Sequence, residues 1–96
     1  MRSVEFLRGA RLDFDESFDW YAQRSVRAAA RFAAVVDAAL ETVAANPTQF
    51  ARLDDIHWEF RLKKFPHRIV YRLVDNRVLV VAIAHAKRRP GYWKRR

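Results

Sequence analysis

The sequence contains no cysteine, and it has only 2 Gly and 3 Pro among its 96 residues. The lack of cysteine excludes disulfides, thiolate metal sites and a cysteine nucleophile. The scarcity of glycine argues against a glycine-rich loop that cradles phosphate. No run of residues reaches the roughly 18 apolar residues of a membrane span, and residues 1–8 lack the apolar segment of a secretion signal. We therefore expect a soluble, cytoplasmic protein that does not contact a membrane.

A metal site is not expected either. The three histidines are His57, His67 and His85, which fall on different predicted strands. Their spacing matches no ligand motif such as two histidines four residues apart on a helix. The sequence also lacks a nucleophile elbow and a P-loop. No cofactor is therefore expected.

Apolar and basic residues are abundant. The hydrophobic share is 51%, and the aromatic residues are 3 Trp, 3 Tyr and 7 Phe. This composition excludes a wholly disordered chain. A chain of this length suits a single domain over residues 1–96 with a modest core, because such a domain buries roughly 60–65% of its unfolded surface.

The formal net charge of +8 is unevenly distributed along the chain. Residues 1–56 hold 7 Lys/Arg and 9 Asp/Glu, whereas residues 57–96 hold 12 Lys/Arg and 2 Asp/Glu. The second segment therefore carries +10, which repels itself unless an acidic partner is bound. We predict a polyanionic or acidic partner for this segment, and the alternative is a basic face that serves only solubility.

The first half of the chain favours a short strand followed by two helices. Residues 4–7 are consistent with an edge strand, and a helix is predicted from about Leu12. One face of that helix carries residues at helical spacing, namely Phe14, Phe18, Tyr21 and Ser25. Acidic residues are expected in its early turns, where the helix dipole favours them, namely Asp13, Asp15, Glu16 and Asp19.

The second helix is the clearest element. Ser25 is a suitable N-cap, and Asn46-Pro47 is expected to end the helix because proline cannot continue the hydrogen-bond ladder. An apolar stripe at helical spacing predicts the buried face, namely Ala29, Phe32, Ala33, Val36, Leu40 and Val43. The two helices together predict an αα-hairpin.

The second half has the period of two that is typical of strands. After a loop over residues 48–56, strands are predicted over residues 58–63, 67–74 and 78–84. Asp75-Asn76 is a tight-hairpin signal, and the last strand is apolar throughout, as expected of a strand covered on both faces. The predicted fold class is α+β, with an N-terminal strand and an αα-hairpin packed on a three- to four-stranded antiparallel sheet.

Several local sequences carry a resemblance to a known family. They are Asp19-Trp20-Tyr21, Ala45-Asn46-Pro47, the segment from Phe65 to Arg72, and the segment from Ala84 to Trp93. Their order and spacing resemble the RelE/ParE toxins of type II toxin–antitoxin systems over nearly the whole chain. The resemblance implies a growth-inhibiting toxin that forms a hetero-oligomer with a cognate antitoxin, and it implies the RelE/ParE-like fold.

The family resemblance leaves two cellular targets open. ParE-like members inhibit DNA gyrase, whereas RelE-like members cleave mRNA on the ribosome. RNA cleavage without a metal needs a base, an acid and cations around the phosphate. The resemblance supplies candidate catalytic residues for the nuclease alternative, namely Arg61, Arg68, His85, Arg88 and Tyr92. Glu59 departs from the nuclease pattern, since it replaces one of a pair of basic residues by a carboxylate that is either a base or the partner of an arginine.

Residues of the basic half are also candidates for contact with the antitoxin or with nucleic acid. They are Arg61, Lys63, Arg68, Arg72, Lys87, Arg88, Arg89 and Trp93. Several have plainer alternatives: Arg68 and Arg72 share one face of a strand and can be merely solvated, and His85 can be a hydrogen-bonded residue at a strand end. Tyr92-Trp93 either folds back onto the core or stacks on a nucleobase.

The expected antitoxin contributes an acidic, amphipathic segment. Its charged groups would meet the basic sheet, and its apolar helix face would fill a groove beside the helix pair. A general nucleic-acid-binding module is the third class of function that this charge distribution allows.

Overall fold

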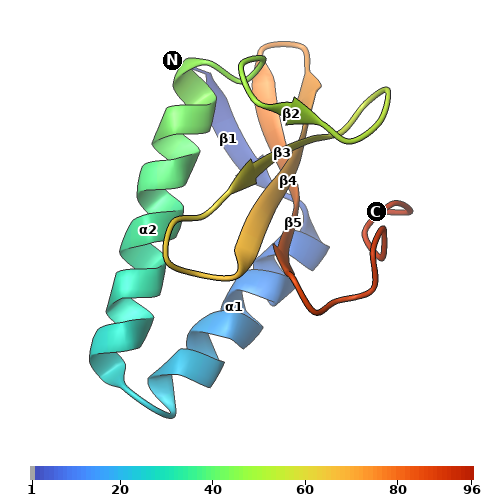
Figure 1. The fold of residues 1–96 in the computed structure, drawn as a ribbon. Coiled ribbons are helices and arrows are strands. Elements are labelled where there is room, and N and C mark those ends of the chain that lie inside the picture. Colours follow the sequence, from blue (N-terminus) through green and yellow to red (C-terminus); the bar gives the residue numbers. More distant parts are fainter. Residues whose placement is uncertain (1) are drawn as a thin grey trace.

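The computed structural model describes residues 2–96 of the chain. It contains two helices and five strands in this order: β1 (Ser3–Phe6), α1 (Arg8–Ala22), α2 (Val26–Ala45), β2 (Ala51–Arg52), β3 (Trp58–Arg61), β4 (His67–Val74) and β5 (Arg77–His85). The strands form one sheet with the order β1-β5-β4-β3-β2. The two helices lie against one face of that sheet (Figure 1), and the predicted α+β class is confirmed.

The sheet is larger than predicted and is not wholly antiparallel. β1 is an edge strand, as expected, and it pairs in parallel with β5. At the other edge, Ala51–Arg52 pairs with β3 inside a segment that was predicted to be a loop. So short a strand has no period of its own, and it exists because its backbone groups find partners on β3.

The first helix begins earlier than its sequence pattern indicated. α1 starts at Arg8 because Leu7 is held in place by its N–H, which donates to the carbonyl of Val80 on β5. Acidic residues were expected in its early turns, but because the helix begins at Arg8 its first turn contains none. Asp13 instead lies in the middle of the helix and is buried, so its role has to be sought in tertiary contacts rather than in the helix dipole.

The second helix follows its local signals. The Ser25 side chain accepts a hydrogen bond from the N–H of Ala28 at 3.1 Å, which is the predicted N-cap. The helix ends at Ala45, directly before Asn46-Pro47. Phe32, Val36 and Val43 of the apolar stripe are fully buried, so the predicted core face is confirmed.

The main core lies between the helices and the sheet. Its central side chains come from α2, β4 and β5, and they include Phe32, Val36, Val43, Ile69, Tyr71, Val78, Val80 and Ile83. Aromatic rings from α1 complete the layer, with the Phe14 and Phe32 ring centroids 5.5 Å apart. This apolar layer holds α1 along β5, beside the cavity between α1 and the ends of β4 and β5.

β5 is covered on both faces, as its apolar sequence predicted. The register between β4 and β5 shifts at Val70/Tyr71, which leaves Val81 as the additional residue of β5. Beyond this bulge, Ala82 and Ala84 pack with Trp93 of the tail on the face opposite the helices. Asp75 supplies the positive φ, 55°, of the β4–β5 hairpin. No helix within residues 2–96 is long and apolar enough to cross a membrane.

Candidate functional site

A buried carboxylate on α1 organises the C-terminal tail, which we define as residues 86–96. β1 pairs with β5 only as far as Val80, so the next part of the β5 edge has no strand beside it. Asp13 fills part of this gap: its Oδ2 accepts hydrogen bonds from the N–H of Ile83 at 3.2 Å and from the hydroxyl of Tyr92 at 2.9 Å. The side chain of Asp13 is only 6% exposed.

Arg96 completes this arrangement from the end of the chain. Its guanidinium donates to both carboxylate oxygens of Asp13, at 2.7 and 3.2 Å, and to the carbonyl of Val81 at 3.0 Å. The bond to Asp13 raises the pKa of Arg96. Because the contact to Asp13 is bidentate and charged, it is of the stronger class of hydrogen bonds. We call Asp13, Tyr92 and Arg96 the tail clamp.

The sequence pattern missed the tail clamp. Asp13 lies three residues after Ala10 and four before Ser17, so it shares the inward side of α1 with two small residues. A carboxylate on the inward side of a helix needs a buried partner, and this was the signal in the sequence that could have indicated the tail clamp. Its partner, Arg96, is 83 positions away in the chain, and nothing in the local sequence indicates that pairing.

The aromatic pair of the tail folds back onto the sheet. Trp93 is 2% exposed and lies 4.6 Å from the ring of His57, centroid to centroid. Burial raises the pKa of Tyr92 to about 12, and its hydrogen bond to Asp13 acts in the same direction. The expectation that Trp93 is a surface residue for a partner therefore does not fit this conformation, because the packed sheet and tail cover its ring.

Arginines form a patch on the sheet face opposite the helices. Arg61 on β3 pairs in register with Arg68 on β4, and Arg72 lies on the same side of β4 because alternate residues of a strand share a face. We call Arg61, Arg68 and Arg72 the basic sheet face. Glu59 lies within it and accepts a hydrogen bond from Arg68 at 3.0 Å, so this carboxylate is the partner of an arginine.

The other predicted basic residues lie in the segments that follow the strands. Lys63 follows β3 and is exposed, and the exposed residues Lys87, Arg88 and Arg89 follow β5. The guanidinium of Arg88 lies 3.9 Å from the ring centroid of Tyr92. The predicted basic residues therefore lie on one sheet face, directly after β3 and in the turn that leads into the tail.

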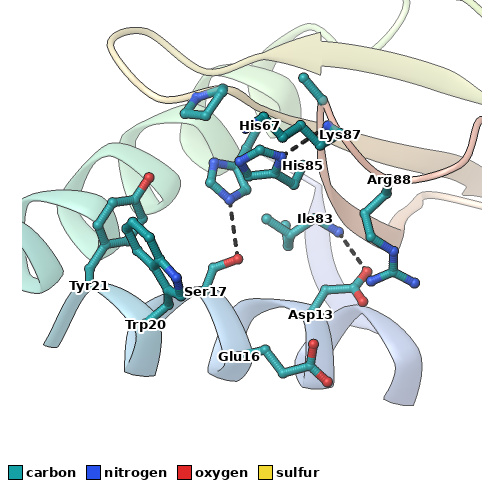
Figure 2. Close-up of a pocket in the computed structure, with 12 residues that line it drawn as sticks. Asp13, Glu16, Ser17, Trp20, Tyr21, His67, Ile83, His85, Lys87 and Arg88 are labelled. Atoms are coloured by element: carbon teal, nitrogen blue, oxygen red, sulfur yellow. Dashed lines mark hydrogen bonds between the residues drawn. The ribbon is translucent and has the colours of Figure 1, made fainter. Parts of the chain in front are cut away.

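A cavity of about 740 Å³ lies between α1 and the ends of β4 and β5. Figure 2 shows how its side chains are arranged, with α1 on one side and the strand ends on the other. Its lining combines aromatic, imidazole, hydroxyl and charged groups, and it includes Ser17, Trp20, His67, His85, Lys87 and Arg88. Glu16 and Asp13 lie on the α1 side of the same cavity.

Two histidines meet at the inner wall of this cavity. His67 is 5% exposed, and its ring centroid lies 4.9 Å from that of His85. Its Nε2 forms a hydrogen bond with the hydroxyl of Ser17 at 3.1 Å (Figure 2). Burial lowers the pKa of His67 to about 4, and the neighbouring His85 acts in the same direction. His67 is therefore neutral near pH 7.

His85 occupies the strand-end position that its sequence context indicated. It is the last residue of β5, and its Nδ1 accepts a hydrogen bond from the N–H of Lys87 at 3.0 Å. In the neutral ring the remaining proton is therefore on Nε2. In the described part of the chain no group of three or more His, Cys, Asp or Glu side chains is placed to hold a metal ion.

The five candidate catalytic residues are divided between two faces of the molecule. Arg61 and Arg68 belong to the basic sheet face, whereas His85 lies with His67 on the helix side. Tyr92 is engaged by Asp13, and Arg88 lies over the ring of Tyr92. They do not converge on one point at which a single phosphate would contact them all.

Comparison with known proteins adds to this geometry. The family model described as the ParE toxin of the type II toxin–antitoxin system, parDE, matches residues 4–90. Among solved structures, a chain of the chromosomal ParDE TA system from P. aeruginosa superimposes with a TM-score of 0.74. That match has 17% sequence identity and covers 88% of this chain and 96% of the other, so it bears on the fold alone. Among curated proteins, no sequence matches significantly.

Proposed function

The chain belongs to the family of ParE toxins of type II toxin–antitoxin systems, and from this premise we propose that it arrests growth by binding and inhibiting DNA gyrase. A cognate antitoxin would neutralise it in a hetero-oligomeric complex. Because gyrase is a cytoplasmic enzyme, the cytoplasm is the compartment in which this action would take place.

The separation of the candidate nucleolytic residues is the observation that supports a binder over a nuclease. Cleavage of RNA needs a base, an acid and cations around one phosphate. Arg68 is paired with Glu59, and the Tyr92 hydroxyl is held by Asp13 with its pKa raised to about 12. His85 lies on the other side of the sheet from Arg61 and Arg68. A protein that acts by occupying a surface of its target needs no such convergence.

The antitoxin would use the basic sheet face and the cavity together. Acidic side chains of its segment would form charge-assisted hydrogen bonds with Arg61, Arg68 and Arg72. An apolar side chain from the same segment would enter the cavity beside Trp20. The arginines would chiefly raise the association rate, since electrostatic steering acts on encounter more than on affinity.

Controlled expression of the chain separates the two targets. Under the gyrase proposal, cells should filament and signal DNA damage, and purified toxin should block supercoiling by gyrase. The antitoxin should restore supercoiling in the same reaction. Rapid loss of protein synthesis with cut transcripts would support the RelE-like nuclease instead, and the absence of any growth effect would contradict both.

A second measurement tests the antitoxin contact. The association rate of toxin and antitoxin should fall steeply between 50 and 500 mM salt, because exposed charges are screened at distances beyond roughly 10 Å at 0.1 M. Arg61→Gln with Arg72→Gln should flatten that dependence. Arg8→Gln with Arg11→Gln removes the same charge from the start of α1 and serves as the matched control. A flat dependence for the unaltered protein would exclude the electrostatic contact.

A further inference from the structure

The tip of the helical hairpin carries a second cationic patch, separate from the basic sheet face and the tail. α1 ends at Ala22 and α2 begins at Val26, and the connection lies at the lower left of Figure 1, away from the C-terminus. Three arginines at this end are exposed, namely Arg24, Arg27 and Arg31. We call these three residues the hairpin tip. Between residues 19 and 31 the only acidic residue is Asp19.

The position of Arg27 has an electrostatic cost within the fold. It lies in the first turn of α2, where the helix dipole presents a partial positive charge, and that turn contains no acidic residue. A cation there is disfavoured, and an anion is favoured. Among the ion pairs between residues 2 and 96, none includes Arg24, Arg27 or Arg31. The fold therefore offers Arg27 and Arg31 no counter-charge.

Arg24 has an internal role that distinguishes it from the other two. Its guanidinium donates to the carbonyl of Trp20 at 2.8 Å and lies 3.6 Å from the centre of the Trp20 ring. The edge contact with Tyr21, at 5.1 Å between centroids, holds the indole from another direction. Trp20 is 52% exposed, yet Arg24 covers one face of its ring.

We propose that the hairpin tip binds the phosphate backbone of duplex DNA. Arg27 and Arg31 are one helical turn apart, about 6 Å along the axis. Both are exposed and can reach phosphates, and the dipole of α2 favours an anion at this end. Arg24 occupies one face of the Trp20 ring, which reduces the aromatic surface on which the bases of a single strand would stack, so a duplex is favoured. Contacts to phosphate carry no sequence information, so we expect this binding to be independent of sequence.

This contact is distinct from the proposed inhibition of gyrase and does not depend on it. Figure 1 shows the tip at the lower left and the tail on the right beside the sheet, so the two lie apart on the molecule. A toxin that is held on its target by one end would still present the tip to DNA. DNA binding by the tip can therefore fail while gyrase inhibition stands, and the reverse is also possible.

The test measures binding of the whole chain to a 20-base-pair duplex by fluorescence anisotropy at several salt concentrations. Arg27→Gln with Arg31→Gln removes two phosphate contacts, so the slope of log K against log salt should become smaller by about 1.8. Between 50 and 200 mM salt, the double variant should accordingly lose affinity about tenfold less than the unaltered chain. The matched control, Arg2→Gln with Arg8→Gln, removes equal charge from the two ends of β1, away from the hairpin tip, and should keep the original slope.

Thermal unfolding of the variants excludes a trivial loss of folding. Arg27→Gln removes a cation from a helix N-terminus, so its Tm should be equal to or higher than that of the unaltered chain. An unchanged slope in the tip variant, or no binding of duplex by the unaltered chain at 50 mM salt, would overturn the proposal. Tighter binding of single strands with quenching of Trp20 fluorescence would also overturn it. The proposal would also be overturned if the tip variant bound an acidic protein more weakly but bound duplex DNA as tightly as the unaltered chain.

Discussion

The two faces of the sheet are covered in different ways. On one face, α1 and α2 bury a continuous layer of apolar and aromatic side chains, among which Phe32, Ile69 and Tyr71 have no exposed surface. On the other face, the tail covers a smaller apolar cluster with Trp93 and is tied down through Asp13 and Arg96. The arginines of the basic sheet face lie beside this second layer.

This difference indicates that the helix-covered face stabilises the fold, whereas the opposite face is available to bind a partner. Apolar burial is not directional and scales with area, so the helix face carries most of the stability. The tail depends on a few contacts with defined geometry around one carboxylate. That arrangement covers β5 and leaves the neighbouring arginines at the surface, where acidic groups can reach them.

The largest effect should come from the centre of the helix face. Phe32→Ala should lower the free energy of unfolding by about 3–5 kcal/mol, because it removes a fully buried ring and leaves a cavity. Urea denaturation followed by circular dichroism measures this loss. Phe32→Leu, which keeps most of the volume, should lose far less. A cost below about 1 kcal/mol for the alanine variant would contradict the assignment of this face as the main source of stability.

Acid should weaken the same face through His67. Its pKa is about 4 in the folded protein against 6.5 for an ordinary histidine, so the unfolded chain binds more protons between these values. Stability should therefore fall as pH is lowered from 6.5 toward 4, by about 3 kcal/mol in all. Denaturation midpoints across this range measure the effect. His67→Gln should remove that part of the pH dependence, and an unchanged profile would exclude His67 as its source.

Loss of the tail clamp should release the tail while the helix face stays folded. Asp13→Asn removes the charge that Arg96 contacts and should cost about 2 kcal/mol, as expected for hydrogen bonds to a charged group. Trypsin should then cleave within residues 87–96 much faster than elsewhere. Asp15→Asn is the matched control, because the ion pair of Asp15 with Arg11 is exposed. Equal protection of the tail in both variants would argue against the clamp.

The smallest change in stability should come from the basic sheet face. Glu59→Gln removes the charge that Arg68 contacts but keeps an oxygen that can accept its hydrogen bond, so it should change stability by less than about 1 kcal/mol. It should nevertheless raise the association rate of an acidic peptide several-fold at low salt, because the patch gains net positive charge. Glu41→Gln changes the same charge on exposed α2 and should have little effect on that rate. Equal association rates for the two variants in stopped-flow measurements would show that Glu59 is not part of the surface that binds the peptide.

Elements with local signals were predictable to within a few residues. Ser25 and Asn46 bound α2 because capping and termination depend on residues within one helical turn. The start of α1 was not predictable, since it depends on the bond between Leu7 and Val80. The two-residue strand β2 likewise exists only through its pairing with β3. In the same way, Arg68 and Arg72 were expected on one face from alternation, whereas the role of Asp13 was not.

The order of helices and strands, the apolar stripe of α2 and the basic second half follow from the sequence alone, because propensity, periodicity and charge are properties of neighbouring residues. The tertiary structure alone decided that Asp13 holds Arg96 and Tyr92, that Trp93 is buried and that His67 stays neutral. These outcomes depend on which distant groups exclude water from one another. Only the packed arrangement of α1, β5 and the tail provides that exclusion.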